Sequence, residues 1–199
     1  MEQSTAHSHD SSQHSEPPRV LLAIARAAIA AHLQQRPYAP PAQPPPWRSS
    51  RGVFVTLREE SGALRGCIGH MEPVLESLSE EVASCAISAA TRDPRFYPVV
   101  AEELEGLTIE LSILARPEAI ADATALDPQR YGVVVAADGR RGVLLPQIDG
   151  VDTPAQQIAI AARKAGLDAT TPLKLWRFQV QKIAEEVPER AAGRPGHGA

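Results

Sequence analysis

Hydrophobic residues recur at helical spacing in two long segments of the chain. They mark one face of a helix when three or four positions separate them. The two faces comprise Val20, Leu21, Ile24, Ala27, Ala28 and Ala31, and then Val74, Leu75, Leu78, Val82, Cys85, Ala86 and Ala89. The spacing predicts one helix over 17–35 and another from 73 to the stop at 93–94. A third helix is expected from the Thr153-Pro154 start to about Lys164.

Shorter segments that are rich in β-branched residues, or that alternate between apolar and polar residues, predict strands. These segments are 53–57, 63–69, 107–113, 131–137, 142–145 and 173–180. A turn joins the first two strands into a hairpin, and Asp138-Gly139 is a strong hairpin signal between the fourth and fifth. Hairpins and isolated strands outnumber strand–helix–strand units. The pattern therefore predicts an α+β fold with mainly antiparallel sheets and flanking helices.

The length of 199 residues fits one domain, which we expect over 17–187. Residues 1–16 are polar and include three histidines, and residues 188–199 are rich in Gly, Pro and Arg. Both ends are expected to be disordered, because such segments bury too little apolar surface to become ordered. A metal-binding tail is the alternative for 1–16. The proline-rich segment 37–46 is expected to be an extended connector.

Charge and motif content exclude several classes of function. The formal net charge of -4 disfavours nucleic acid as a partner, because phosphate binding needs a basic surface. No segment reaches the roughly 20 apolar residues of a membrane span. The sequence contains no phosphate-binding glycine loop, paired-cysteine zinc site or Gly-x-Ser-x-Gly elbow. Two free cysteines suit a reducing cytoplasm, with a single disulfide as the alternative. We predict a cytoplasmic protein without a metal site, and the sequence identifies no cofactor.

The second predicted strand carries the most informative chemistry. Side chains alternate along a strand, so Arg65 and Cys67 are predicted to share one face while Leu64 and Ile68 enter the core. A guanidinium close to a thiol favours the reactive thiolate. Cys67 is therefore a candidate nucleophile with Arg65 as its partner, and a buried cysteine that only packs is the alternative. His70 follows at the strand's end as a candidate base or ligand.

Two carboxylates and an arginine elsewhere in the chain are candidates for the same site. Glu110 lies on the polar face of its strand and is predicted to pair with Arg65, which would bring it beside Cys67. A solvent-facing strand residue is the alternative. Asp93 and Arg95 follow the second helix in a tight turn, where either residue could line the site.

Two glycines and an amide are predicted to contact a substrate. Gly66 and Gly69 have no side chain, so another backbone or a ligand can approach their strand closely. Gln147 ends a strand and is predicted to donate hydrogen bonds into a cleft. A loop amide without such a role is the alternative.

These motifs resemble the AMMECR-type domain family. The match to the family hallmark is 64–69 (LRGCIG), and further matches are 52–57 (GVFVTL), 93–96 (DPRF), 109–114 (IELSIL), 142–147 (GVLLPQ) and 164–167 (KAGL). They follow in the family's order between about residues 17 and 185. The resemblance implies two subdomains around a cleft near the cysteine motif. It does not supply an established reaction.

The presence of His70 and of the short segment 144–147 makes the chain similar to the bacterial branch called AmmeMemoRadiSam system protein A. That branch is associated with a Memo-like protein related to extradiol dioxygenases and with a radical-SAM protein. Two hypotheses follow. The first is an enzyme or enzyme component centred on Arg65 and Cys67, aided by His70 and Glu110. The second is a non-catalytic binding or regulatory module that pairs with Memo-like and radical-SAM proteins.

Overall fold

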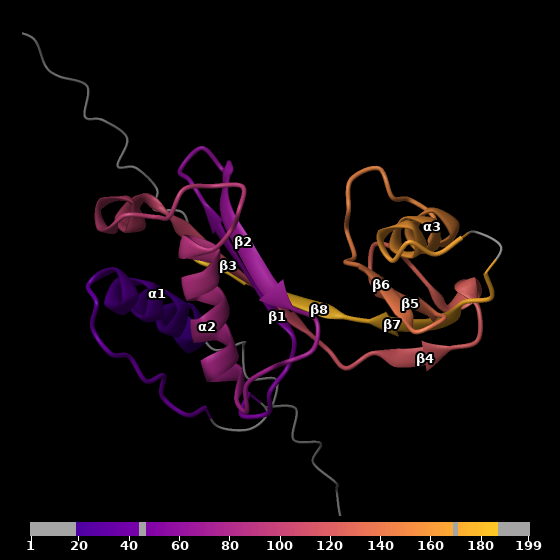
Figure 1. Ribbon diagram of the computed structural model, residues 1–199, viewed down its shortest axis with the longest axis horizontal. Coiled ribbons are helices and arrows are strands. Elements are labelled where there is room, and N and C mark those ends of the chain that lie inside the picture. Colours follow the sequence, from indigo (N-terminus) through magenta and orange to yellow (C-terminus); the bar gives the residue numbers. More distant parts are fainter. Residues whose placement is uncertain (1–18, 44–46, 169–170, 187–199) are drawn as a thin grey trace, which may run out of the picture.

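The computed structural model describes residues 19–43, 47–168 and 171–186. This part of the chain forms two four-stranded sheets whose strands pair antiparallel, with helices packed on both sheets (Figure 1). The predicted α+β class is confirmed. Among these residues, no helix is both long and apolar enough to cross a membrane. The expected disordered ends, 1–16 and 188–199, lie outside the described residues.

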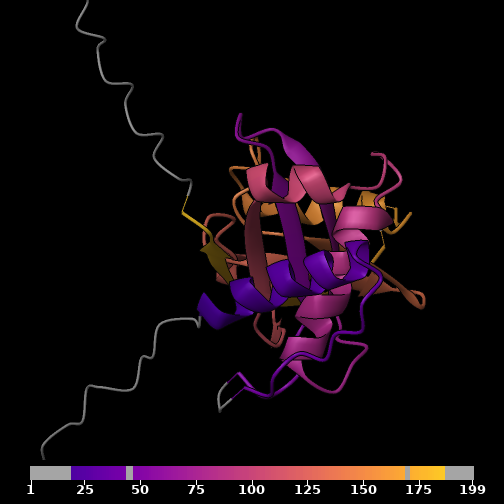
Figure 2. The same cartoon turned by 90° about the vertical axis from the view of Figure 1, so that its left-hand side faces the viewer.

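The first sheet has the strand order β2-β1-β3-β8. Its strands are β1 (Val53–Arg58), β2 (Leu64–His70), β3 (Thr108–Leu114) and β8 (Val180–Ala184). Helices α1 (Arg19–Leu33) and α2 (Leu78–Thr91) cover one face of it, as the two views in Figures 1 and 2 show. The main hydrophobic core lies between these layers and includes the fully buried Val53, Val55 and Leu57 of β1.

The second sheet has the strand order β4-β7-β5-β6. Its strands are β4 (Glu118–Ile120), β5 (Gly132–Ala137), β6 (Arg140–Leu144) and β7 (Lys174–Phe178), and α3 (Pro154–Lys164) packs on β5 and β6. The 3-10 helices η1 (Ala101–Gly106) and η2 (Ala123–Ala125) lie in the connections. The β5–β6 turn has positive φ at both Asp138 (50°) and Gly139 (73°), as the predicted two-residue hairpin requires.

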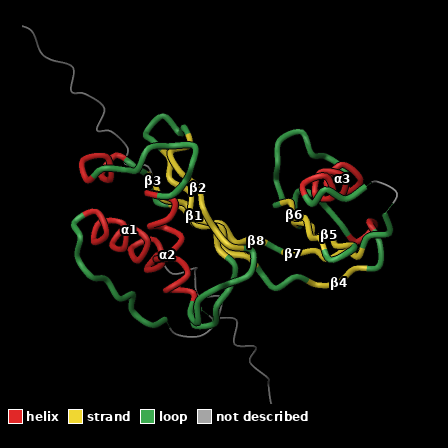
Figure 3. Tube along the Cα trace, in the orientation of Figure 1, coloured by secondary structure: helices red, strands yellow, loops and turns green. Residues whose placement is uncertain are grey.

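One chain segment that was predicted as a single strand serves both sheets. The segment 173–180 forms the end of β7 at Phe178 and the start of β8 at Val180, so the chain changes sheet at Gln179 (Figure 3). A separate hydrophobic cluster packs the two sheets together at this crossing. It comprises Leu114, Val134 and Phe178, with Phe54, Met71, Val143, Leu145, Trp176 and Val180 against them.

The helix α2 begins at Leu78 rather than at the predicted Pro73. Ser77 caps it: Ser77 Oγ accepts the Glu80 N–H, and the Glu80 carboxylate accepts the Ser77 N–H. Val74, which the periodicity assigned to the helix, lies before this cap and is 66% exposed. The apolar spacing continues across 73–77, but the reciprocal cap makes Ser77 the residue before the first turn, so the helix begins at Leu78.

Replacement of Gly142 by alanine is expected to destabilise the second subdomain. A Cβ at Gly142 would collide with the Ala161 carbonyl oxygen of α3, which the helix backbone cannot easily move. Overpacking of this kind costs about 1–3 kcal/mol. Urea denaturation of Gly142→Ala would measure the loss. Gly106→Ala is the matched control, because a Cβ at Gly106 meets no atom within 4 Å. Equal stability of the two variants would contradict the close packing of α3 on β6.

Candidate functional site

The pairing of β2 with β1 decides which way the side chains of the cysteine strand point. Residues directly opposite each other on paired strands lie on the same face of the sheet. Cys67 lies opposite Thr56, on the face away from the helices, whereas His70 lies opposite the buried Val53, on the face that α2 covers. This corrects the predicted grouping of His70 with Cys67, because the two side chains lie on opposite faces of β2.

The Cys67 thiol is free and only partly buried. Thr56 Oγ1 donates a hydrogen bond to Cys67 Sγ at 3.2 Å. The Thr56 hydroxyl is thus the polar partner of the thiol on this face of the sheet. Thr56 was not among the residues predicted for the site. The alternation of 53–57 puts Thr56 on the polar face, but only the hairpin register sets it opposite Cys67.

Asp93 and Arg95 cover the outer edge of β2 at Cys67. Asp93 Oδ2 accepts the backbone N–H of Cys67 at 2.8 Å, and Arg95 Nη2 lies 3.4 Å from the Cys67 carbonyl oxygen. The two side chains pair with each other, with Arg95 Nη2 2.6 Å from Asp93 Oδ2. β2 is an edge strand, whose outward backbone groups have no neighbouring strand. The ion pair therefore completes the backbone hydrogen bonding of the cysteine.

The positive charge of Arg95 interacts with Cys67. The Arg95 guanidinium holds the pKa of the buried Asp93 well below its usual range, and the N–H groups of Cys67 and Arg95 act in the same direction against the effect of burial. The hydrogen bond to Asp93 raises the pKa of Arg95, and the charges of Asp93 and of Cys67 add to that effect. Arg95 is thus held in place as a cation beside the cysteine strand.

Arg65 has a different partner from the one predicted. Its Nη2 lies 3.0 Å from Glu103 Oε2, and its Nη1 donates to the Tyr97 carbonyl oxygen at 3.0 Å. The register between β1 and β2 shifts at Arg58, which lies opposite Leu64. This irregularity removes Leu64 from the alternation that was predicted to place it in the core with Ile68. The Arg65 guanidinium is directed to η1 and its preceding loop.

Glu110 lies on the same face of the sheet as Cys67, as predicted. The predicted ion pair with Arg65 is not what brings it there. It is directly opposite Thr56 on β1, and its Oε2 is 3.5 Å from Arg58 Nε. Cys67, Thr56 and Glu110 therefore form a polar row across three adjacent strands. Two strand spacings separate Cys67 from Glu110 by about 10 Å. The predicted ion pair between Glu110 and Arg65 is wrong, because Glu110 pairs with Arg58.

The two glycines of the cysteine strand accommodate the protein's own packing. A Cβ at Gly66 would collide with the Ala89 carbonyl oxygen in α2, and a Cβ at Gly69 would collide with the backbone and ring of Phe54. Of the two predicted roles, the close approach of another backbone is present at both glycines. Contact of either glycine with a substrate stays a prediction.

Gln147 reaches the face of Cys67 from the second subdomain. Its Oε1 accepts a hydrogen bond from Lys182 Nζ of β8 at 3.2 Å. Lys182 lies opposite Ser112, and Ser112 lies opposite Phe54, one row along the sheet from Thr56 and Glu110. Gln147 is therefore at the rim of the face that carries the polar row. Its predicted contact with a substrate is untested.

A hollow lies at the Arg65 end of the cysteine strand, on the first subdomain alone. The cleft that the resemblance implies between the subdomains stays a prediction. The hollow has a volume of about 440 Å³, and it is lined by the turn 59–61, Arg65, Glu103 and residues 106–107. Arg65 and Glu103 thus form one wall of this hollow through their ion pair.

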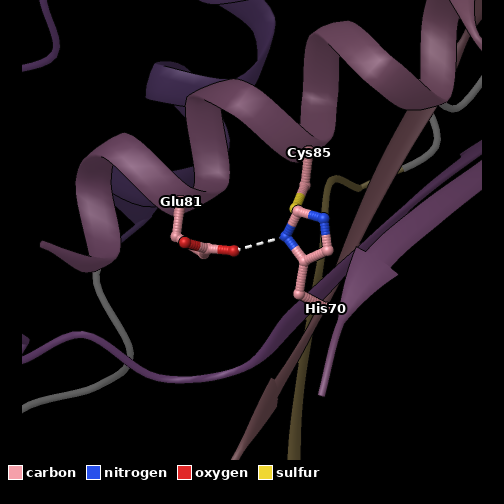
Figure 4. A group of neighbouring side chains, drawn as sticks. All are labelled: His70, Glu81 and Cys85. Atoms are coloured by element: carbon pink, nitrogen blue, oxygen red, sulfur yellow. Dashed lines mark hydrogen bonds and ion pairs between the residues drawn. The ribbon is translucent and has the colours of Figure 1, made fainter. Parts of the chain in front are cut away.

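The other face of β2 carries a second polar cluster that the sequence analysis missed (Figure 4). His70 Nδ1 lies 2.6 Å from Glu81 Oε1 and 3.7 Å from Cys85 Sγ. Glu81 and Cys85 are buried, and burial, helped by the Glu81 charge, raises the pKa of the Cys85 thiol to about 12. The spacing of Glu81 and Cys85 by four positions could have indicated a shared helix face. Their meeting with His70 depends on how α2 packs on β2.

The fold and the two clusters define an α+β protein with two antiparallel subdomains and a cysteine on an edge strand. Residues 22–183 match the AMMECR1 family model, and the chain belongs to this family.

Two relatives match this chain over most of their own length. A protein of Thermofilum pendens is 38% identical over 194 residues, covering 85% of this chain and 90% of that protein. A protein of Methanothermobacter thermautotrophicus is 40% identical over 185 residues, covering 84% and 94%. The crystal structure of an uncharacterized protein from Pyrococcus horikoshii is similar with a TM-score of 0.71 and 34% identity, covering 83% of this chain and 90% of that one.

A longer relative also contains this domain. The Clostridium acetobutylicum protein CA_C1420 is 41% identical over 135 residues, which are 68% of this chain but only 28% of that protein. The domain can therefore be one part of a larger polypeptide.

Loss of the Asp93 charge is expected to weaken the fold and to flatten its response to acid. Because the folded pKa of Asp93 is lowered, its stabilisation is complete above the ordinary carboxyl pKa of about 3.9 and is lost as the pH falls further. Asp93→Asn should lose about 1–3 kcal/mol at neutral pH, the usual cost of a disrupted buried hydrogen-bonding group. Below about pH 4 its stability should fall less steeply than that of the unmodified protein.

Denaturant titrations at several pH values would measure both effects. Asp149→Asn, at an exposed aspartate, is the control and should leave the acid response unchanged. An Asp93→Asn variant whose stability falls as steeply in acid as that of the unmodified protein would contradict the assigned role of the Asp93–Arg95 pair.

Proposed function

We propose that this protein is an enzyme or enzyme component whose reacting group is the Cys67 thiol. The observation that carries the proposal is the pair of polar groups next to Cys67. Thr56 Oγ1 donates a hydrogen bond to the Cys67 sulfur at 3.2 Å, and the Arg95 guanidinium lies beside the Cys67 backbone. Thr56 and Arg95 thus place a hydrogen-bond donor at the sulfur and a cation beside the strand that carries it. The thiol is also partly exposed, as a nucleophile or redox thiol must be.

Cys85 in the same chain illustrates the opposite environment. It is fully buried, and the pKa of its thiol is raised to about 12, first by burial and then by the charge of Glu81. A thiol of this kind is protonated at neutral pH and inert toward electrophiles. The contrast between the two cysteines supports Cys67 as the thiol that reacts with an electrophile.

The remaining polar residues of the Cys67 face suit the binding of a substrate. The Glu110–Arg58 pair supplies both signs of charge about 10 Å from the thiol, a distance set by two strand spacings. Lys182 and Gln147 offer a cation and an amide at the rim. In this proposal Arg95 takes the role first assigned to Arg65, and Arg65 borders the neighbouring hollow with Glu103. His70 belongs to the opposite face.

Alkylation of the native protein with iodoacetamide tests the reactivity of Cys67. Mass spectrometry should find Cys67 modified and Cys85 protected, since the buried thiol is almost wholly protonated at pH 8. Arg95→Gln should slow the reaction about fivefold, which corresponds to a screened charge interaction of about 1 kcal/mol. Arg95→Lys, which keeps the charge, should retain most of the rate. Thr56→Val, which removes only the hydroxyl, should also slow it.

An unreactive Cys67 in the folded protein would refute the proposal. So would a rate that neither Arg95→Gln nor Thr56→Val changes, because the surroundings of the thiol would then have no effect on it.

A second candidate function is a binding or regulatory module for Memo-like and radical-SAM proteins. It is favoured by the Clostridium acetobutylicum relative, in which the matching region is only 28% of the polypeptide. Large apolar side chains after α2 offer a contact surface: Tyr97 is 90% exposed and Val100 is 52% exposed. Such a module would need the surface and not the thiol.

Binding measurements with a purified Memo-like protein would separate the two candidates. The module predicts that Cys67→Ser binds normally, whereas Tyr97→Ala combined with Val100→Asp weakens binding at least tenfold. Isothermal titration calorimetry would give both affinities. Absence of measurable binding by the unmodified protein would contradict the module and leave the thiol chemistry as the remaining function.

A further inference from the structure

His70, Glu81 and Cys85 bring three different donor atoms together on the helix-covered face of β2. His70 is the last residue of β2, while Glu81 and Cys85 lie one helical turn apart on α2 and both point toward it (Figure 4). One ring nitrogen of His70, a carboxylate oxygen of Glu81 and the sulfur of Cys85 all lie within 4.8 Å of one another. Within the described residues, these three side chains are the group of histidine, cysteine and acidic residues whose donor atoms lie close enough together to hold a metal ion.

We propose that His70, Glu81 and Cys85 bind a divalent transition-metal ion of the zinc type. Imidazole nitrogen, carboxylate oxygen and thiolate sulfur are the three ligand types that Zn²⁺ takes in proteins. Cys85 would release its proton to solvent as it binds the ion, because a coordinating thiol is deprotonated by the metal charge. Magnesium and calcium are poor candidates, because they prefer oxygen ligands throughout. This site is separate from the Cys67 thiol, which points to the opposite face of the sheet.

One of the three donor separations is close to that of a tetrahedral ion, and the other two would adjust as the ion binds. With ordinary zinc–ligand bond lengths, two donors lie about 3.4–3.6 Å apart. The separation between His70 Nδ1 and Cys85 Sγ is 3.7 Å. The 2.6 Å between His70 Nδ1 and Glu81 Oε1 is a hydrogen bond, and it would have to open by about 1 Å or less as the ion replaces the shared proton.

The carboxylate of Glu81 is held in position by the backbone. Its side chain is fully buried, and its Oε2 accepts the N–H groups of Val74 and Leu75 at 3.0 and 2.9 Å. These bonds direct Oε1 to His70. Hydrogen bonds that orient a ligand in this way are typical of metal sites, where they strengthen binding. The segment before α2, which is not helical, provides this support.

Access to the site runs along His70. The His70 side chain is 39% exposed, whereas Glu81 and Cys85 are buried. An ion can therefore enter from solvent past the imidazole and leave its two other ligands inside the protein. Three protein ligands leave one position of a tetrahedral ion for water or a further ligand, as in catalytic zinc sites.

Titration of the full-length protein with Co²⁺ tests the proposal, because Co²⁺ reports its ligands by absorption. All variants should also carry His7→Ala, His9→Ala and His14→Ala, which removes the histidines of residues 1–16 as competing ligands. One equivalent of Co²⁺ should produce a thiolate-to-cobalt charge-transfer band and the intense ligand-field bands of four-coordinate cobalt. Zn²⁺ added afterwards should displace the cobalt and remove both.

Two single variants and one matched control assign the ligands. Cys85→Ala should abolish the charge-transfer band, and His70→Gln should weaken Co²⁺ binding more than tenfold. Cys67→Ala, which removes the other cysteine of the chain, should leave band and affinity unchanged. Circular dichroism would establish that each variant is folded, and His70→Gln, at a partly exposed position, decides the outcome if Cys85→Ala fails to fold.

Three results would overturn the proposal. The first is the absence of a thiolate-to-cobalt band from the protein at stoichiometric Co²⁺. The second is that the band remains in Cys85→Ala, and the third is that it disappears in Cys67→Ala. In the first case the cluster is a hydrogen-bonded ion pair that only anchors α2 to β2. These results are independent of the alkylation of Cys67, so either proposal can fail without the other.

Discussion

The register between β1 and β2 is the constraint on which the functional surfaces depend. It sets Cys67 opposite Thr56 and His70 opposite Val53, so the two polar clusters lie on opposite faces of one strand. A shift of the register by one residue would exchange these faces. Cys67 would then point into the core beneath α2, and His70 would lose Glu81. The buried Val53, Val55 and Leu57 oppose such a shift, because it would move them out of the core.

The edge position of β2 has a second consequence. An unpaired edge would leave the backbone of Cys67 open to solvent or to another chain. Asp93 and Arg95, which follow α2, occupy that edge and bring a cation beside the thiol. One ion pair therefore connects the end of α2, the backbone of the cysteine strand and the electrostatics of the candidate site.

The change of sheet at Gln179 relates the two subdomains. It directs β8 along the outer edge of the first sheet, and so brings Lys182 to the loop that carries Gln147. The apolar cluster around Phe178 holds the crossing in place. The face that carries Cys67, Thr56 and Glu110 is consequently bordered by Gln147, which lies in the loop after β6. Gln147 and Lys182 are 35 positions apart in the sequence, and only the fold brings them together.

Sequence alone determined the α+β class, the hairpins and the family, because all of these follow from short-range periodicity and local motifs. Tertiary structure decided the partners. Arg65 bonds to Glu103 and not to Glu110, since the irregular register at Leu64 and the position of η1 are not local properties. The meeting of His70 with Glu81 and Cys85 likewise required the packing of α2 on β2. Periodicity specifies the face on which a side chain lies, but only the assembled core specifies what it touches there.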